Sequence, residues 1–326
     1  MYTNRGFGVK KEVPTVDLPQ CPTDSVSDIA FNLENTHLGV SSWDGSVTVY
    51  QMSFYPGTSS AFSFERVINL GKPVLSLCFF NNILFAGLAD GTIMSVDSSM
   101  IVPAHSAPVK ALKNFSNKFL VSGSFDSTLK FWNVSNKLDL LHSITLPSKI
   151  YAMDLKDNFL CVALSDKSVI TYNLDDMTQQ NVFNTKFNYS IRSVGCHKDL
   201  DSFAVGSIEA KVEAFSRTNP IKRFIFRCHR VESRLYSVNV VRFYPVDSTF
   251  IITGGSDGGL TCFDKMTRSK ICSFEFSSPV TAGEFSNDGK YFVFATGDDW
   301  SKGYTGVAVK PLLKMIAMSS VPGIPK

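Results

Sequence analysis

The chain has 326 residues, of which 44% are hydrophobic and 27 are Phe, so it can bury a large core. Its formal net charge of +3 is too small for the whole surface to act as a nucleic-acid binder. Seven scattered cysteines without a C-x-x-C pair favour free thiols in a reducing compartment. The N-terminus lacks the apolar core of a signal peptide, and we expect no membrane contact.

A short turn with an acidic residue recurs seven times, each time followed by an alternating apolar strand. SWDGSVTVY at Ser42–Tyr50 and SDGGLTCF at Ser256–Phe263 are clear copies. The acidic residues lie about 36–48 residues apart and are Asp44, Asp90, Asp126, Asp166, Glu209, Asp257 and Asp298. This period, with four short strands in each unit, is typical of a β-propeller of the WD40 type.

Each repeat begins with a strand of apolar alternation. In chain order these strands are expected at Val26–Phe31, Pro73–Phe80, Pro108–Leu112, Ile150–Leu155, Ser190–Cys196, Tyr236–Phe243 and Pro279–Phe285. Residues 1–19 are expected to form an N-terminal arm whose strand pairs into the last blade and closes the ring, and residues 312–326 a short C-terminal tail. The prediction is therefore an all-β chain, with residues 1–326 forming a single seven-bladed WD40-type β-propeller.

The third repeat keeps the most complete polar pattern. His105 precedes its first strand, and Ser122, Asp126 and Trp132 follow at the spacing of the structural tetrad of WD repeats. In that arrangement Asp holds the imidazole, which bonds the Ser hydroxyl, which in turn bonds the indole N–H. We therefore predict a structural role for His105.

Other motifs suggest chemistry only superficially. Gly254–Gly258 matches the G-x-S-x-G nucleophile elbow, but no His follows His229, so the hydrolase order of residues is impossible. Two Cys-His dipeptides could be drawn as a zinc site, yet adjacent residues on a strand point to opposite faces and each dipeptide would offer one ligand. We predict an interaction platform that is not an enzyme, with no catalytic residue, metal or cofactor.

Several stretches are more specific than a generic WD repeat. They include SSWDG at Ser41–Gly45, HSAPVK at His105–Lys110, FIFRCHR at Phe224–Arg230, YSVNVVRFYP at Tyr236–Pro245 and DWSKG at Asp299–Gly303. Together they resemble the WD-repeat mRNA export factors of the nuclear pore, over roughly residues 20–305. The sister family, the mitotic-checkpoint WD-repeat protein of kinetochores, shares part of this set but usually lacks DWSKG, so the export family is favoured.

The resemblance implies an adaptor that binds a short Glu-containing peptide motif of a Phe-Gly nucleoporin on its top face. It also implies a location in the nucleus, at the nuclear pore complex, with shuttling to the cytoplasm. The candidate peptide-binding residues are Trp43, Phe125, Lys211, Phe224, Phe226, Arg227 and Trp300. Because Lys211 is a point charge whereas Arg227 can make a two-pronged contact, Arg227 should contribute more. At least one of Phe224 and Phe226 should pack under the loop rather than contact the ligand.

Two alternatives remain open. The chain could be a kinetochore scaffold that reads acidic or phosphorylated peptides, with a mitotic checkpoint kinase-type partner. It could also contact messenger ribonucleoprotein or RNA directly through a basic segment. That segment carries Lys211, Arg217, Lys222, Arg223, Arg227, Arg230 and Arg234. Without paired aromatic stacking motifs, we expect RNA binding to be weak and indifferent to sequence.

Overall fold

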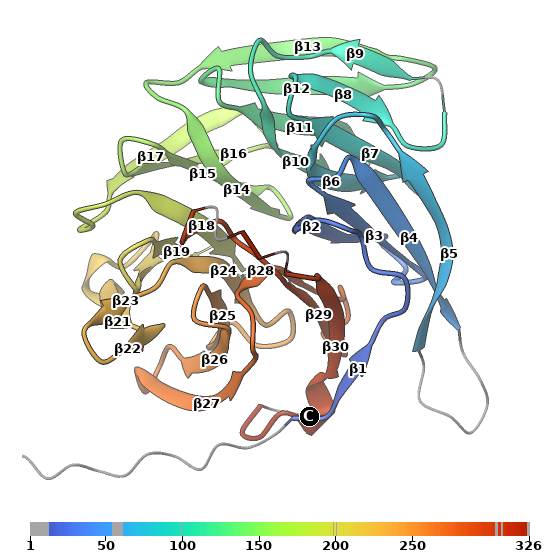
Figure 1. Cartoon of the computed structure of the whole chain (residues 1–326). Coiled ribbons are helices and arrows are strands. Elements are labelled where there is room, and N and C mark those ends of the chain that lie inside the picture. Colours follow the sequence, from blue (N-terminus) through green and yellow to red (C-terminus); the bar gives the residue numbers. More distant parts are fainter. Residues whose placement is uncertain are drawn as a thin grey trace, which may run out of the picture.

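The computed structural model describes residues 13–324 except 54–60, 99, 198, 200, 304, 305 and 308. Within these residues the strands form seven four-stranded antiparallel sheets and one two-stranded hairpin. The sheets surround a central channel as the blades of a propeller (Figure 1). The predicted seven-bladed β-propeller is confirmed.

The first four blades each use four consecutive strands, ordered from the channel outward. Blade one contains β2 (Val26–Phe31), β3 (His37–Ser42), β4 (Ser46–Ser53) and β5 (Ala61–Asn69). Blade two contains β6 (Val74–Phe80), β7 (Ile83–Leu88), β8 (Thr92–Ser95) and β9 (Ile101–Pro103). Blade three contains β10 (Val109–Phe115), β11 (Phe119–Ser124), β12 (Thr128–Val134) and β13 (Leu138–Thr145). Blade four contains β14 (Ile150–Lys156), β15 (Phe159–Leu164), β16 (Ser168–Asn173) and β17 (Thr178–Asn184).

The last three blades carry the irregular elements of the chain. Blade five contains β18 (Ile191–Cys196), β19 (Ser202–Ser207), β20 (Lys211–Ser216) and β21 (Phe224–Arg227), with the short helix η1 (Pro220–Lys222) before β21. The hairpin β22 (Arg230–Val231) and β23 (Arg234–Leu235) leads to blade six, which contains β24 (Val238–Phe243), β25 (Phe250–Gly255), β26 (Gly259–Asp264) and β27 (Ser269–Glu275). Blade seven contains β28 (Val280–Phe285), β29 (Tyr291–Thr296), β30 (Leu312–Ala317) and β1 (Thr15–Asp17), and the short helix η2 (Met318–Ser320) follows β30.

The acidic turn residues lie between the second and third strands of every blade, as predicted. In the six Asp copies a carboxylate oxygen accepts a hydrogen bond from the amide two residues later, for example from Ser46 to Asp44 at 2.8 Å. This short bond fixes a tight turn. The residue after the acid often has a positive φ, and at Gly258 a Cβ atom would lie 2.2 Å from the carbonyl oxygen of Phe276. We call the face that carries these seven anchor turns the top face.

The ring is closed by pairing between the two ends of the described chain. Strand β1 pairs antiparallel with β30, with Thr15 opposite Ile316, and the two strands lie side by side in Figure 1. The Leu18 amide donates to the Leu313 carbonyl at 2.8 Å, and the Leu18 side chain is buried. The closing strand thus lies within the arm expected at residues 1–19, of which residues 1–12 are outside the described residues.

The expected C-terminal tail over residues 312–326 is wrong for its first six residues. Residues 312–317 form β30, the third strand of blade seven. The long insertion between the last anchor turn and this strand displaces the strand along the sequence, so its alternating apolar residues were mistaken for a tail. The described part of the real tail begins at η2 and packs Val321 and Ile324 against blades six and seven.

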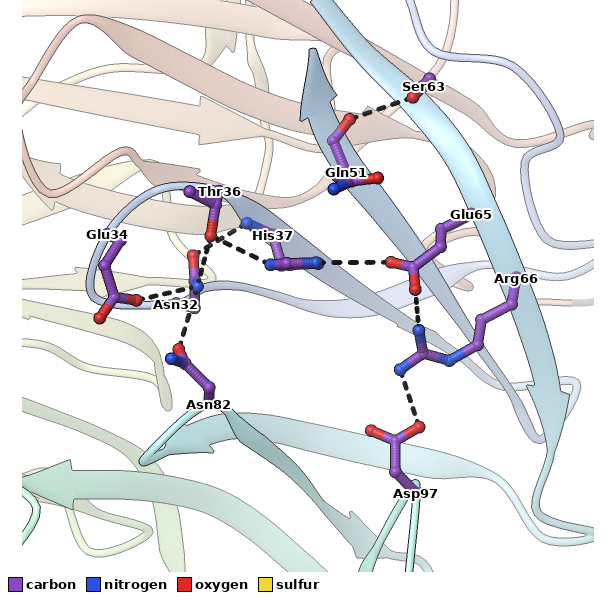
Figure 2. A network of polar contacts seen from close by, with 10 residues as sticks. All are labelled: Asn32, Glu34, Thr36, His37, Gln51, Ser63, Glu65, Arg66, Asn82 and Asp97. Carbon is purple, nitrogen blue, oxygen red and sulfur yellow. Dashed lines mark hydrogen bonds and ion pairs between the residues drawn. The ribbon is translucent and has the colours of Figure 1, made fainter.

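Blades one and two share an apolar cluster, and polar contacts between the two blades surround it. Figure 2 shows this network, in which the Asn32 amide donates to Asn82 Oδ1 at 3.1 Å. Farther out, Arg66 Nη2 on β5 lies 2.7 Å from Asp97 Oδ1 in the turn after β8. The Arg66–Asp97 pair is partly exposed, so its contribution to stability is small, and the network mainly sets the relative position of the two blades.

We expect deletion of residues 1–19 to lower the free energy of unfolding by about 2–4 kcal/mol. The deletion removes the β1 pairing and the burial of Leu18, and it leaves β30 as an unpaired edge. Deletion of residues 1–12, which keeps β1, is the matched control. Thermal and urea unfolding of both variants would test this, and equal stability of the two would contradict the closure.

Candidate functional site

The channel is lined at its top by one residue from each blade. Every innermost strand has a bulge at its second residue, which has no Cα partner on the next strand. A bulge re-aims a side chain, and all seven of these residues line one cavity of about 660 Å³. They are Ser27, Leu75, Lys110, Tyr151, Arg192, Asn239 and Thr281, and we call them the upper ring.

The upper ring contains two cations and no carboxylate. Burial, together with the charge of Arg192, lowers the pKa of the Lys110 ammonium to about 8, despite the nearby Asp28 carboxyl. Arg192 is exposed and directs Nε to Asn239 Oδ1 at 3.4 Å. The Arg192 charge opposes protonation of Lys110, and two neighbouring cations form an environment that favours a bound anion.

Deeper in the channel the charges are paired. Lys113 Nζ lies 3.2 Å from Asp154 Oδ1, and Arg242 Nε lies 2.7 Å from Glu284 Oε2. Burial opposes ionisation of Asp154, but Lys113 and Arg242 hold the pKa of its carboxyl well below the usual range. The Asp154 carboxylate also accepts a hydrogen bond from the Cys196 amide at 2.9 Å. The lower channel is therefore neutralised internally, unlike the upper ring.

Three predicted peptide-binding residues meet at the rim of this cavity. Trp43, Phe125 and Trp300 all line it, although they come from blades one, three and seven. Trp43 is 47% exposed and Trp300 is 53% exposed, whereas Phe125 packs edge-on against Tyr151 at 5.8 Å between ring centroids. The rim thus presents aromatic surface directly above the cationic ring.

The Asp299–Gly303 loop is held to blade six by one half-buried carboxylate. Asp299 accepts hydrogen bonds from Asn239 Nδ2 at 2.9 Å and from the Ser256 hydroxyl. Burial opposes the charge of Asp299, but the bonds from Ser256, Ser301 and Asn239 lower the pKa of this carboxyl. The loop therefore lies ordered on the top face, and Trp300 is fixed by its neighbour rather than by its own packing.

The other predicted residues form a separate group on blade five. Lys211 on β20 and Arg227 on β21 are direct cross-strand partners, so their side chains point to the same face. Lys211 Nζ lies 3.1 Å from Glu209 Oε2, which neutralises part of its charge. Arg227 is exposed. Neither residue lines the 660 Å³ cavity.

Phe224 and Phe226 lie on the opposite side of β21 from Arg227. The Phe226 ring packs against Phe263 of blade six at 4.2 Å between centroids, and the Arg268 guanidinium lies 5.0 Å from the Phe224 ring. Both rings are partly buried against the core between blades five and six. Their packing supports β21, whereas Ile225 and Arg227 face solvent.

A groove extends from the channel mouth toward blade six. It has a volume of about 750 Å³ and shares Arg192, Asn239 and Asp299 with the cavity. Ile208 and Leu235, both exposed, supply apolar surface along it. The groove makes the top face a continuous concave surface with cationic and apolar parts.

The tetrad residues of blade three form one chain of hydrogen bonds. His105 Nδ1 donates to Asp126 Oδ2 at 3.0 Å, while the Ser122 hydroxyl donates to His105 Nε2 at 2.8 Å. Trp132 Nε1 donates to the same hydroxyl at 2.8 Å. Burial lowers the pKa of His105 in spite of Asp126, so its imidazole is neutral at neutral pH. The site holds blade three together and has no open position for a substrate.

Sequence reasoning missed an equivalent cluster in blade six. His229 Nδ1 lies 2.8 Å from Asp257 Oδ1, and its Nε2 lies 2.9 Å from Thr253 Oγ1. Phe263 takes the place of the Trp, so no indole continues the series, and Thr253 Oγ1 lies 3.4 Å from the Thr261 carbonyl oxygen. The signal was present, because Thr253 precedes Asp257 by the same interval as Ser122 precedes Asp126. The hairpin β22–β23 lengthens the spacing from His to Asp and concealed it.

Sequence reasoning also missed the upper ring, although its residues occupy the second position of each innermost strand.

For the part of the chain with described coordinates, His, Cys, Asp and Glu nowhere gather in a group of three that could hold a metal ion. The described helices include none that is long and apolar enough to span a bilayer. The arrangement on the top face can bind an anionic, partly apolar ligand by charge and shape.

Comparison with known proteins gives a consistent result. The WD domain, G-beta repeat family matches residues 14–51 and 96–133. The chain is 32% identical to WD40 repeat protein poxJ of Penicillium oxalicum, covering 89% of this chain and 88% of that protein. It is 30% identical to the Poly(A)+ RNA export protein of Schizosaccharomyces pombe, covering 93% and 89%, respectively. Mitotic checkpoint protein BUB3.1 of Arabidopsis thaliana is 26% identical and covers 88% of each chain. A solved structure of U3-55K matches the fold with a TM-score of 0.78 at 14% identity, covering 93% of this chain and 98% of that one.

The two histidine clusters give a quantitative test of their structural role. We expect Ser122→Ala to lower the free energy of unfolding by about 2–4 kcal/mol, because it leaves both His105 Nε2 and Trp132 Nε1 buried without a partner. Thr253→Ala removes the partner of His229 Nε2 but leaves no indole N–H unpaired, and it should cost about 1–2 kcal/mol. Urea unfolding would measure both. Ser135→Ala, at an exposed position of blade three, should change stability by less than about 0.5 kcal/mol. Equal effects of all three substitutions would contradict the assignment.

Proposed function

The chain belongs to the family of WD-repeat mRNA export factors, and we propose that it is a non-catalytic adaptor that docks a Glu-containing peptide motif of a Phe-Gly nucleoporin on its top face. In this role it supports the export of messenger RNA at the nuclear pore complex and shuttles between nucleus and cytoplasm. The observation that carries the proposal is the pair of neighbouring cations Lys110 and Arg192, which line the cavity beneath an aromatic rim.

A glutamate side chain entering the cavity would lie between Lys110 and Arg192. Charge-assisted hydrogen bonds of this kind are stronger than neutral ones, and more so where water is excluded. Trp43 and Trp300 at the rim would cover the aliphatic part of the peptide and limit solvent access. The Glu284 and Asp154 carboxylates do not compete for the upper cations because each already pairs with a deeper one.

Blade five offers a second contact for the same peptide. Arg227 is exposed and can bind a carboxylate with two parallel hydrogen bonds. Its cross-strand partner Lys211 is a weaker candidate because Glu209 already pairs with it. The groove lined by Ile208 and Leu235 begins beside Arg192 and gives apolar side chains of the peptide a place to pack.

Two other candidates use the same surface or its neighbour. The similarity to a mitotic checkpoint protein favours, second, a kinetochore scaffold that reads acidic or phosphorylated peptides, with a checkpoint kinase-type partner. Direct contact with messenger ribonucleoprotein or RNA through the basic segment is a weaker third candidate. There Arg223 lies 2.6 Å from Glu213, and Lys211 pairs with Glu209, so part of the segment's charge is already neutralised.

Affinity capture from nuclear extract separates these functions. The full-length chain should recover Phe-Gly nucleoporins in the presence of nuclease. Recovery of kinetochore proteins instead would favour the checkpoint role. Recovery that disappears after nuclease treatment would indicate that RNA bridges the chain to its partners. Either this result or the recovery of kinetochore proteins in place of nucleoporins would contradict the proposal.

We expect Arg227→Glu to weaken binding of a nucleoporin-type peptide by about 2–5 kcal/mol, because a partly desolvated carboxylate would face a like charge. Lys211→Glu should cost less, since Lys211 is already paired with Glu209. Calorimetric titration with the peptide, alongside a melting curve, would measure both effects. The fold should survive in each case because neither side chain is buried.

Lys137→Glu is the matched control, because Lys137 is an exposed cation on blade three, outside the site. Trp300→Ala tests the channel mouth in the same titration and should weaken binding with little change in melting temperature. An Arg227→Glu variant that binds as tightly as the Lys137→Glu variant would remove Arg227 from the site.

A further inference from the structure

Two cysteines of blade six face each other across neighbouring strands. Cys262 lies on β26 and Cys272 on β27, and the two are direct Cα partners in the antiparallel register. None of the seven cysteines, all of which lie within the described residues, forms a disulfide in this structure. The pair is therefore present as two thiols.

The geometry of this pair suits a disulfide. Directly opposed residues of antiparallel strands have Cα atoms about 4.5–5.5 Å apart, within the 4.4–6.8 Å that disulfides span. Cross-strand partners also point to the same face, and both thiols lie in the apolar cluster between blades six and seven. The register shifts directly after Cys262, and such a bulge gives the backbone local freedom to adjust.

The two thiols differ in their access to solvent. Cys262 is 1% exposed, whereas Cys272 is partly exposed on the outermost strand of the blade. A hydrogen bond with Cys272, together with burial, raises the pKa of the Cys262 thiol well above its usual range. Because Cys272 is the more exposed thiol, a soluble oxidant reaches it first, and Cys262 lies beside it as the resolving thiol.

The other close cysteine pair lacks these properties. Cys161 and Cys196 come from different blades and are both buried, at 0% and 1% exposure. The Cys196 thiol is also directed to Asp154 Oδ2 at 3.4 Å. An oxidant has no open path to that pair, so Cys262 and Cys272 are distinguished by access as well as by register.

We propose that Cys262 and Cys272 form a site of reversible oxidation that takes peroxides as its oxidant. Hydrogen peroxide converts the Cys272 thiol to a sulfenic acid and releases one water. The Cys262 thiol then attacks that sulfur, the S–S bond forms, the S–O bond breaks, and a second water leaves. Overall two thiols lose two electrons and two protons to one peroxide, and a dithiol reductant reverses the change.

The bond would join the third and outermost strands of blade six. It would close a short loop around the β26–β27 turn and restrict the unfolded chain, which stabilises the folded state. The C-terminal segment packs against the same cluster through Val321 and Ile324, so the cross-link would also fasten the surface on which that segment lies.

Peptide mapping can identify the bond directly. The reduced full-length protein is treated with a small excess of hydrogen peroxide, alkylated and digested with trypsin without reductant. Residues 243–265 and 271–290 form tryptic peptides with one cysteine each, namely Cys262 and Cys272. We expect these peptides to be linked, two of the seven thiols to be lost, and the melting temperature to rise by about 3–6 °C. Dithiothreitol should reverse all three changes.

Cys272→Ser should abolish the link, the thiol loss and the rise in melting temperature. Cys21→Ser is the matched control, because Cys21 is also partly exposed, and it should behave like the wild type. Either of two results would overturn the proposal. One is a link between Cys161 and Cys196 in place of the expected one, and the other is oxidation of Cys272 to sulfinic acid without any link.

Discussion

The whole structure depends on the antiparallel pairing of β1 with β30. No blade has a complete core of its own, because the apolar clusters contain residues of adjacent blades. Each sheet is therefore stable only when both neighbours are present, and a ring with one strand missing would expose the face and the edge of its last blade. The upper ring inherits this dependence, because its seven residues meet in one cavity only when all seven innermost strands surround the channel.

The sequence carried the blade plan because the anchor turns are local structures. An aspartate that accepts a bond from the amide two residues later needs no tertiary partner, so each turn could be located from its own few residues. The family resemblance, confirmed by relatives such as the Poly(A)+ RNA export protein, likewise rests on short contiguous motifs. The sequence analysis did not identify two features whose spacing is changed by an insertion. The β22–β23 hairpin concealed the His229 cluster, and the long last turn concealed β30.

The candidate site was predictable only in part, for a related physical reason. The repeat pattern locates the anchor turns and therefore the aromatic residues in them, and Trp43 and Trp300 both lie at the rim of the cavity. Lys110 and Arg192 stand in otherwise ordinary strands, and only the bulge at the second position turns them into the channel. Their importance also depends on how they differ from the deeper cations of the channel, and the sequence of a single strand does not show that difference. The deeper Lys113 is paired because a buried charge without a partner is costly, whereas Lys110 is half-buried and Arg192 exposed at the channel mouth, where a ligand can reach them.

Trp300 shows how the fold holds a binding residue in an unfavourable conformation. Its φ of 59° lies in the left-handed region, which a bulky residue rarely adopts. Such a conformation persists only where the surroundings determine it. Here its amide donates to Asp298 Oδ1 at 2.9 Å, and the next carboxylate along, Asp299, bonds Asn239 and Ser256 of blade six. The exposed indole therefore depends on a contact between blades six and seven, so the packing of neighbouring blades sets the position of the rim together with the loop sequence.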